Sequence, residues 1–296
     1  MRDVLRLGAL LAWVALATSR LGLLADELVG HGGTALAMGA HVTEVRLFWF
    51  AGGWIRYVGV PSTAAALAIA MGGIAVETVC GTVLWLAVRG DGLGRRIVRG
   101  LAAALVLHAS WYLATGAFAG FGDGALLYKE LGSARIPVAI AAGAVTCAAA
   151  FFGAREVLGA LAATQRRHRI AGTVAAILLA GGLHAGLALG ELHVRRDRTY
   201  TETMRPERER VIAQETARWE QMHPDAVAAE RAAQVMKIES AHPPAFPFTI
   251  VLALATAAAV IAGAARAKPG QGAITRRLLI QWAVAAAIAI AIVIAV

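Results

Sequence analysis

Long apolar runs separated by short polar connections make up most of this chain. Seven of the runs are long enough to cross a bilayer, because about 18 to 20 apolar residues suffice for a membrane-spanning helix. They cover roughly residues 4–24, 61–88, 98–116, 135–154, 170–193, 247–265 and 276–296. The first run is followed by no clear small-x-small cleavage site, so we interpret it as a retained span and not as a signal peptide. The pattern predicts an all-α polytopic membrane protein.

One polar interruption has a strand pattern. Residues 41–50 and 54–58 are rich in β-branched and aromatic side chains, and they flank the pair Gly52-Gly53. Two such runs around a Gly-Gly pair predict a short β-hairpin over 41–58. Lipid cannot satisfy the edges of a hairpin, so we expect it at the membrane interface or packed on protein.

The longest hydrophilic stretch covers residues 194–246. Two charged segments within it, 205–219 and 225–239, predict an extramembrane helical hairpin, with Pro206 and Pro224 near the helix starts. The plainest interpretation is a solvated hairpin, and the alternative is a lid or a surface for a protein partner. The chain then divides into a membrane core (1–193), this hairpin (194–246) and a C-terminal pair of spans (247–296).

Composition and charge agree with a membrane protein. Apolar residues make up 58% of the chain and charged residues 16%, whereas soluble domains carry about 25% charged residues. The net charge of +9 comes from arginines that cluster in the connections 89–99, 155–169 and 266–277. By the positive-inside rule these connections and the N-terminus are cytoplasmic, in what we expect to be a bacterial inner membrane. The basic charge therefore indicates a lipid bilayer as partner and no nucleic acid.

The strongest candidate for chemistry follows the first span. Asp26, Glu27 and His31 stand in an otherwise apolar region, and ionisable groups at membrane depth are costly enough to suggest a function. On an α-helix Glu27 and His31 share one face, with the i, i+4 spacing of two metal ligands. Three interpretations stay open: a metal site, a structural or proton-handling Glu/His pair, and an interfacial helix with its acids in water.

The order of motifs resembles that of the site-2-protease family of intramembrane zinc metalloproteases. An acidic/His helix, a Gly-rich helix and a β-hairpin with Gly-Gly precede later spans, and the chain contains Phe121-Gly122-Asp123-Gly124. The family carries HExxH on an early helix and takes a further ligand from a later motif that ends in Asp-Gly. The resemblance covers residues 20–130. It implies zinc held by His31, Asp123 and Glu27 or a histidine, with Glu27 or Asp26 as the catalytic base.

That resemblance implies a hydrolase for membrane-embedded or juxtamembrane peptides, which acts through metal-activated water. The chain departs from the family in one place. Glu27 stands where the family keeps its first histidine, and Leu28 stands where it keeps the catalytic Glu. A catalytically inactive membrane scaffold with a relic metal site, which binds a partner through 194–246, is therefore an alternative.

Further ionisable residues lie within the spans. His108 has Tyr112 one turn later, Glu77 is deep in the second span, and His193 is near the outer end of the fifth. One interpretation makes each an additional ligand or a group behind the ligands. For His108 the alternative is a hydrogen bond between helices. For Glu77 the alternatives are a pair with His108 across the bundle and the lining of a polar cavity. A proton-coupled transporter, with a polar path through Glu27, Glu77, His108 and His184, is the second alternative function.

Overall fold

The computed structural model describes residues 2–158, 166–205, 207–267 and 274–296. Within them, seven helical segments are long and apolar enough to cross a membrane, which confirms the predicted all-α polytopic architecture. These segments are Arg2–Ala37, Thr63–Ala87, Leu93–Ala119, Gly124–Val157, Ile170–Arg195, Ala228–Arg266 and Arg276–Ala295.

The elements follow one another as a helical chain with one inserted hairpin. The first span is a continuous helix in three parts. In chain order the elements are α1 (Arg2–Leu24), η1 (Ala25–Gly32), α2 (Gly33–Ala37), β1 (His41–Leu47), β2 (Gly53–Val58), α3 (Thr63–Ala87), α4 (Leu93–Ala119), α5 (Gly124–Leu131), η2 (Gly132–Ala134), α6 (Arg135–Leu158), α7 (Arg166–Arg195), α8 (Arg198–Thr203), α9 (Arg208–Met222), α10 (Ala228–Ala241), α11 (Ala245–Arg266) and α12 (Arg276–Ala295).

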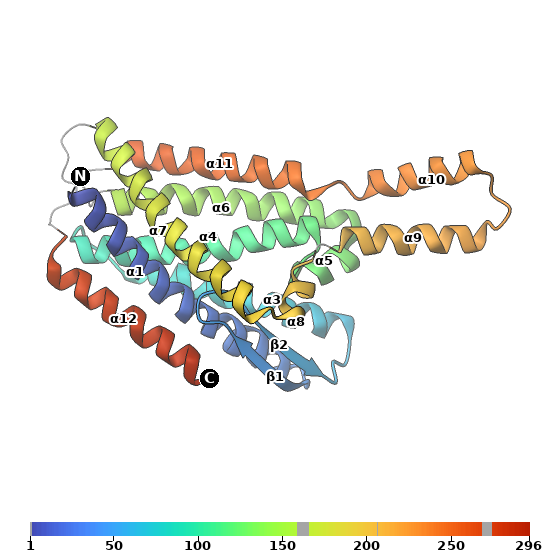
Figure 1. Cartoon of the computed structure of the whole chain (residues 1–296), viewed down its shortest axis with the longest axis horizontal. Coiled ribbons are helices and arrows are strands. Elements are labelled where there is room, and N and C mark those ends of the chain that lie inside the picture. The colour runs from blue at the N-terminus through green and yellow to red at the C-terminus, as the bar shows by residue number, and fades with distance from the viewer. Residues whose placement is uncertain (1, 159–165, 206, 268–273) are drawn as a thin grey trace.

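Small residues bring the spans together. α4 packs on α3 and α6, and α1 packs on α7 and α12 (Figure 1). At Gly81 in α3, an added Cβ would lie 2.7 Å from the carbonyl oxygen of Ala102 in α4. In lipid, helix association depends on such close backbone contact and not on a hydrophobic driving force.

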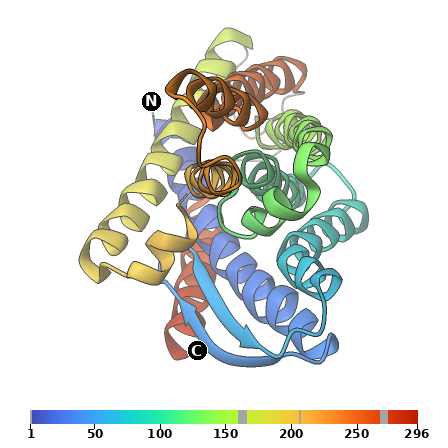
Figure 2. The same ribbon diagram turned by 90° about the vertical axis from the view of Figure 1, so that its right-hand side faces the viewer.

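The predicted β-hairpin is confirmed. β1 and β2 pair antiparallel, with Leu47 opposite Gly53 and an irregularity between Val42 and Glu44. The hairpin lies against η1 and α2, between α7–α8 and α3 when the molecule is viewed from the α9–α10 end (Figure 2). The hairpin therefore packs on protein through η1 and α2, while most of its residues are exposed or half-buried.

The two helices predicted in the hydrophilic stretch are present. α9 and α10 pack on one another and project from the bundle (Figure 1). Each begins three residues after the predicted start, and Pro206 lies outside the described residues. The short helix α8 was not expected from the sequence, and it leads from α7 to the projecting pair.

Candidate functional site

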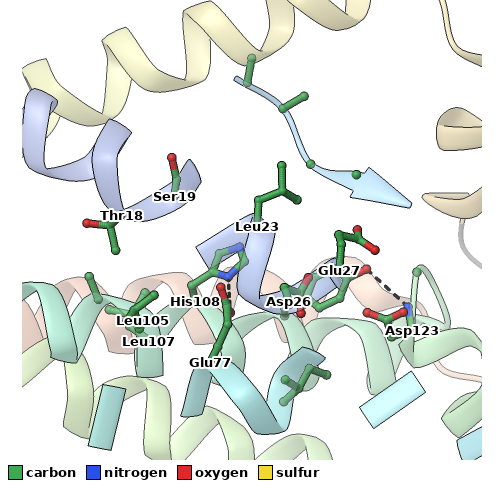
Figure 3. A pocket seen from close by; sticks show the side chains of 18 of the residues that line it. Thr18, Ser19, Leu23, Asp26, Glu27, Glu77, Leu105, Leu107, His108 and Asp123 are labelled. Atoms are coloured by element: carbon green, nitrogen blue, oxygen red, sulfur yellow. Dashed lines mark hydrogen bonds and ion pairs between the residues drawn. The ribbon is translucent and has the colours of Figure 1, made fainter. Parts of the chain in front are cut away.

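A cavity of about 1070 Å³ lies among the spans, and the predicted site residues line it. Asp26 and Glu27 enter it from η1, Asp123 from the α4–α5 loop, and Glu77 and His108 from α3 and α4 (Figure 3). His31, also on η1, lines the same cavity. The remaining wall is mainly apolar and includes residues of α1, α3, α4, α5, α6, α7, α8 and β2. Ionisable groups from distant parts of the sequence therefore meet in one membrane-embedded space.

The helix that carries the motif is a π-helix and not an α-helix. Over Ala25–Gly32 the hydrogen bonds run from residue i to i+5, so residues five apart share a face. Asp26 is consequently the acid beside His31, with its Oδ1 atom 3.8 Å from the His31 Nε2 atom. Glu27 and His31 line the same cavity, and the acids within ion-pair distance of the His31 Nε2 atom are Asp26 and Asp123.

Glu27 instead faces the β-hairpin. Its carboxylate lies below β2, where a Cβ added to Gly53 would be 3.1 Å from the Glu27 Oε1 atom (Figure 3). The residue is only 5% exposed. No described residue donates a hydrogen bond to its carboxylate or forms an ion pair with it. A buried, unpartnered carboxylate at the cavity wall is free to accept a proton from a bound molecule.

A glycine-rich loop brings Asp123 to His31. Gly120 ends α4 with φ +74°, and Gly122 has φ +54°, a conformation that favours glycine. Asp123 follows directly and places its Oδ2 atom 3.2 Å from the His31 Nε2 atom. The backbone N–H of Asp123 donates to the hydroxyl of Tyr112 over 3.4 Å. The predicted approach of Asp123 and His31 is confirmed.

His31 is held so that its outer nitrogen faces the two acids. Its Nδ1 atom lies 2.7 Å from the carbonyl oxygen of Ile69, which can only accept a hydrogen bond. The Nδ1 atom therefore carries a proton, and the Nε2 atom points at Asp26 and Asp123. Two carboxylates around this atom favour a positive charge there. That charge is either a second proton on the His31 ring or a metal ion between His31, Asp26 and Asp123.

Glycines in α3 make room for these side chains. An added Cβ at Gly73 would lie 1.8 Å from the Asp26 Oδ1 atom and 2.7 Å from the His31 Nε2 atom. At Gly30 in η1, an added Cβ would lie 2.4 Å from the Cα atom of Gly73. The π-helix and α3 therefore touch backbone to backbone directly at the site. Gly73 belongs to the site, although no chemical group marks it in the sequence.

Glu77 and His108 form a separate pair in the same cavity. The His108 Nδ1 atom is 2.8 Å from the Glu77 Oε2 atom, which is one of the alternatives that the sequence left open for Glu77. The rings of His108 and Tyr112 stack at 6.4 Å between centroids. His184 also lines the cavity, and its buried Nδ1 atom has no hydrogen-bond partner among the described residues. His193, in contrast, is exposed and does not line the cavity, so the structure does not bring it to the site.

Two charged residues that sequence reasoning left without a role hold the hairpin. Arg20 in α1 donates to three carbonyl groups of the β1–β2 loop, and Glu191 in α7 accepts from three of its N–H groups. Glu191 is 8% exposed, although it lies close to the end of its span. The signal that marks Arg20 is its place inside the first apolar run, since an intramembrane charge is costly.

Tyr57 and Tyr200 add hydroxyl groups around the hairpin. Tyr57 in β2 faces the cavity, and burial followed by the negative charge of Asp123 raises its pKa above the ordinary tyrosine value. Burial likewise raises the pKa of Tyr200, whose ring meets Phe48 edge-on at 5.1 Å between centroids. Both hydroxyl groups therefore keep their protons at neutral pH and can donate a hydrogen bond.

The described residues contain no group of three or more His, Cys, Asp or Glu side chains already arranged to hold a metal ion. The two carboxylates around His31 come nearest to such a group. The chain matches no family model, and no curated protein or solved structure is significantly similar to it.

Proposed function

We propose that this protein is a membrane-embedded metal-dependent hydrolase of the site-2-protease type, which cleaves peptides within or beside the bilayer. The observation that carries the proposal is the arrangement around His31. One imidazole nitrogen faces the carboxylates of Asp26 and Asp123, and the unpartnered carboxylate of Glu27 lines the same cavity. A separate observation, the hairpin beside Glu27, supports a peptide as substrate.

Two distances at His31 support zinc as the proposed metal. Zinc bonds of about 2.0 to 2.2 Å in a tetrahedral site place ligand atoms about 3.3 Å apart. The His31 Nε2 atom lies 3.2 Å from Asp123 Oδ2 and 3.8 Å from Asp26 Oδ1. The Nδ1 hydrogen bond to Ile69 is the kind of outer contact that orients metal-binding histidines. Asp26, His31 and Asp123 would therefore hold the metal.

The π-helix changes how the motif compares with HExxH. A π-helix accommodates one extra residue in an α-helix, so Asp26 and His31 take the relation that the two histidines have in HExxH. Glu27, directly after the first ligand, then takes the place of the catalytic Glu. The sequence comparison aligned Glu27 with the first ligand of HExxH and Leu28 with its catalytic Glu, which is shifted by one residue from the revised alignment. In the revised comparison the only exchange is Asp26 for a histidine.

Each residue at the site then has its own role in the proposed hydrolysis. A bound zinc ion would polarise the scissile carbonyl and make a water molecule acidic. Glu27 takes the proton from that water and passes it to the leaving amine, since its carboxylate has no competing partner. Tyr57 donates a hydrogen bond to the oxygen on which negative charge develops. The apolar walls keep other water away from the site.

The hairpin would present the substrate. β2 pairs with β1 along one edge, and Gly53, Trp54, Ile55 and Tyr57 of β2 line the cavity. The second edge of β2 has no strand partner in the described part of the chain, so an extended peptide can pair with it. With the arginine-bearing connections on the cytoplasmic side, the hairpin end faces outward from a bacterial inner membrane.

Metal analysis of the purified protein tests the proposal. The wild type should hold one zinc ion per chain and hydrolyse an unfolded protein such as β-casein in detergent. Glu27→Gln should keep the metal and lose the hydrolysis, because only the base is changed. A wild type without stoichiometric metal sinks the proposal, as does a Glu27→Gln variant that is fully active.

A proton-coupled transporter is the second candidate, and the Glu77–His108 pair favours it. This pair lies in the same cavity as the acids around His31, so two proton-binding groups follow one another through the spans. Protein reconstituted in liposomes should then carry protons, and Glu77→Gln should stop the flux while metal content stays at zero. Proton flux that is indistinguishable from empty liposomes removes this candidate.

A further inference from the structure

The loop between β1 and β2, residues 48–52, is bound from two sides by charged side chains of different spans. Arg20 of α1 is 3% exposed and Glu191 of α7 is 8% exposed. The Arg20 Nη1 atom donates to the carbonyl oxygens of Phe48 and Ala51, each at 2.7 Å, and Nη2 donates to that of Phe50 at 3.1 Å. One guanidinium thus holds three backbone acceptors of a single turn.

Glu191 binds the same turn through its donors. The N–H of Trp49 donates to the Glu191 Oε1 atom at 2.7 Å, and the N–H groups of Phe50 and Ala51 donate to Oε2 at 2.6 and 3.1 Å. The peptide groups 48–49 and 50–51 are therefore bound at both ends, with a positive charge at the oxygen and a negative charge at the N–H. Their dipoles are aligned with the field of the two side chains.

Further contacts make this double attachment firm. The Arg195 Nε atom lies 2.9 Å from the Glu191 Oε1 atom, and the Arg195 guanidinium stacks over the rings of Phe48 and Trp49 at 5.2 and 4.6 Å. Charge-assisted hydrogen bonds are about twice as strong as neutral ones. In the membrane the loop has few other partners for its polar groups. The attachment fixes the loop relative to both spans.

The loop that Arg20 and Glu191 bind leads directly into β2. Gly53, the first residue of β2, stands two residues after Ala51 and directly above the Glu27 carboxylate. Pairing with β1 sets the position of β2 within the hairpin, but it does not set the position of the hairpin relative to η1. The contacts with Arg20 and Glu191 provide that second constraint.

We infer that Arg20 and Glu191 are positioning residues, which set where the free edge of β2 lies relative to Glu27. They thereby determine which bond of an extended peptide reaches the site. The inference rests on the proposed hydrolase function, because it assigns a role to the β2 edge in that reaction. It adds a specificity role for two intramembrane charges that do not touch the reacting atoms.

The first experiment needs no activity. Amide hydrogen exchange is measured across residues 48–58 in the full-length protein in detergent, for wild type, Arg20→Gln and Glu191→Gln. Loss of these charged hydrogen bonds should speed exchange about tenfold or more at residues 49–51, and also over β2 at 53–58. Exchange that changes only at 49–51, or nowhere, overturns the inference, because the loop would then not position the strand.

The second experiment reads the position of cleavage. Fragments of β-casein are identified by mass spectrometry, together with KM, kcat and zinc content. Both variants should cleave at additional bonds two residues from the wild-type positions, since a sliding strand re-pairs every second residue. KM should rise about tenfold while kcat stays within about threefold. Unchanged cleavage positions with less product indicate a merely structural role and overturn the inference.

Matched controls separate these effects from general loss of charge or of folding. Arg218→Gln and Glu209→Gln remove exposed charges of α9 and should behave as wild type in both experiments. Arg20→Lys keeps the charge without the planar fork and should give an intermediate spread of cleavage positions. A wild type that neither binds zinc nor cleaves casein refutes the hydrolase, and hydrogen exchange then decides about the attachment alone.

Discussion

Two histidines in the same cavity have carboxylate partners, but their surroundings differ. His31 is enclosed, with 6% of its side chain exposed, and it faces two carboxylates from separate elements. His108 has one carboxylate partner, and 68% of its side chain is accessible, because that surface looks into the cavity. The first group lies on a π-helix pressed against glycine, whereas the second bridges two ordinary α-helices.

The comparison shows why His31, and not His108, is the proposed metal ligand. At His31 the Nδ1 atom binds a backbone carbonyl, and the Nε2 atom faces the two carboxylates. At His108 the Nδ1 atom itself binds the Glu77 carboxylate. One negative charge neutralises one imidazolium, so the His108 pair is complete. The two carboxylates at His31 leave an excess of negative charge that a divalent cation would balance.

Removal of the two histidines should give the largest difference. His31→Ala should weaken zinc binding on the order of 100-fold or more, since it removes a ligand and not an outer contact, and Asp123→Ala should do the same. His108→Ala should keep stoichiometric zinc. Metal content by mass spectrometry and casein hydrolysis provide the measurement. Equal loss of zinc in the His31 and His108 variants would erase the distinction between the two groups.

Filling the space beside Asp26 and His31 should give the second-largest loss of zinc. Gly73→Ala places a Cβ 1.8 Å from the Asp26 carboxylate, so the helices must separate, at a cost of about 1 to 3 kcal/mol. Zinc content and melting temperature should fall together. Gly186→Ala is the control, because Gly186 does not line the cavity and an added Cβ there would have nothing within 4 Å among the described residues. A Gly73→Ala protein with normal zinc would mean that Asp26 is no ligand.

Shortening the π-helix should have a smaller effect. Deletion of Val29 from η1 leaves Asp26 and the histidine four residues apart, the relation that an α-helix needs for a shared face. We expect zinc affinity within about tenfold of wild type. Insertion of one alanine at the same place should abolish binding, because the histidine then turns away. Isothermal titration with zinc tests both, and similar affinities for the two variants contradict the π-helical account.

Breaking the Glu77–His108 pair should have the smallest effect on zinc binding and stability. Glu77→Gln replaces a charged hydrogen bond to His108 with a neutral one, and His108 is accessible from the cavity, so the loss should be about 1 kcal/mol. Zinc content and the cleavage positions in casein should not change. Thermal unfolding in detergent measures the stability. A strong loss of zinc in this variant would mean that the Glu77–His108 pair and the groups around His31 form a single site.

Much of the architecture was predictable because long apolar runs and β-branched runs around Gly52-Gly53 leave few alternatives. The partnership of Asp123 with His31 was predictable only from the resemblance, since the two residues are far apart in the sequence. The acid that faces His31 was not predictable. Neither the identity nor the spacing of residues 25–32 distinguishes a π-helix from an α-helix, and this difference exchanges Asp26 for Glu27.

Other parts of the site depend on tertiary contacts that leave no local pattern. Arg20 and Glu191 are far apart in sequence, and their roles depend on a loop that folds between them. His193 looked close enough to the outer end to reach the site, but its position around α7 turns it outward. Gly73 resembles any small residue in a span until the position of Asp26 is known.

The single extra residue of η1 also affects how related chains are recognised. A search pattern with a fixed gap counts letters, whereas the fold conserves the direction in which side chains point. A chain with two residues between Glu and His in an α-helix, and a chain with three in a π-helix, present the same groups to the cavity. A pattern that allows either gap, and requires a following hairpin and an Asp-Gly loop, would place such chains in one alignment.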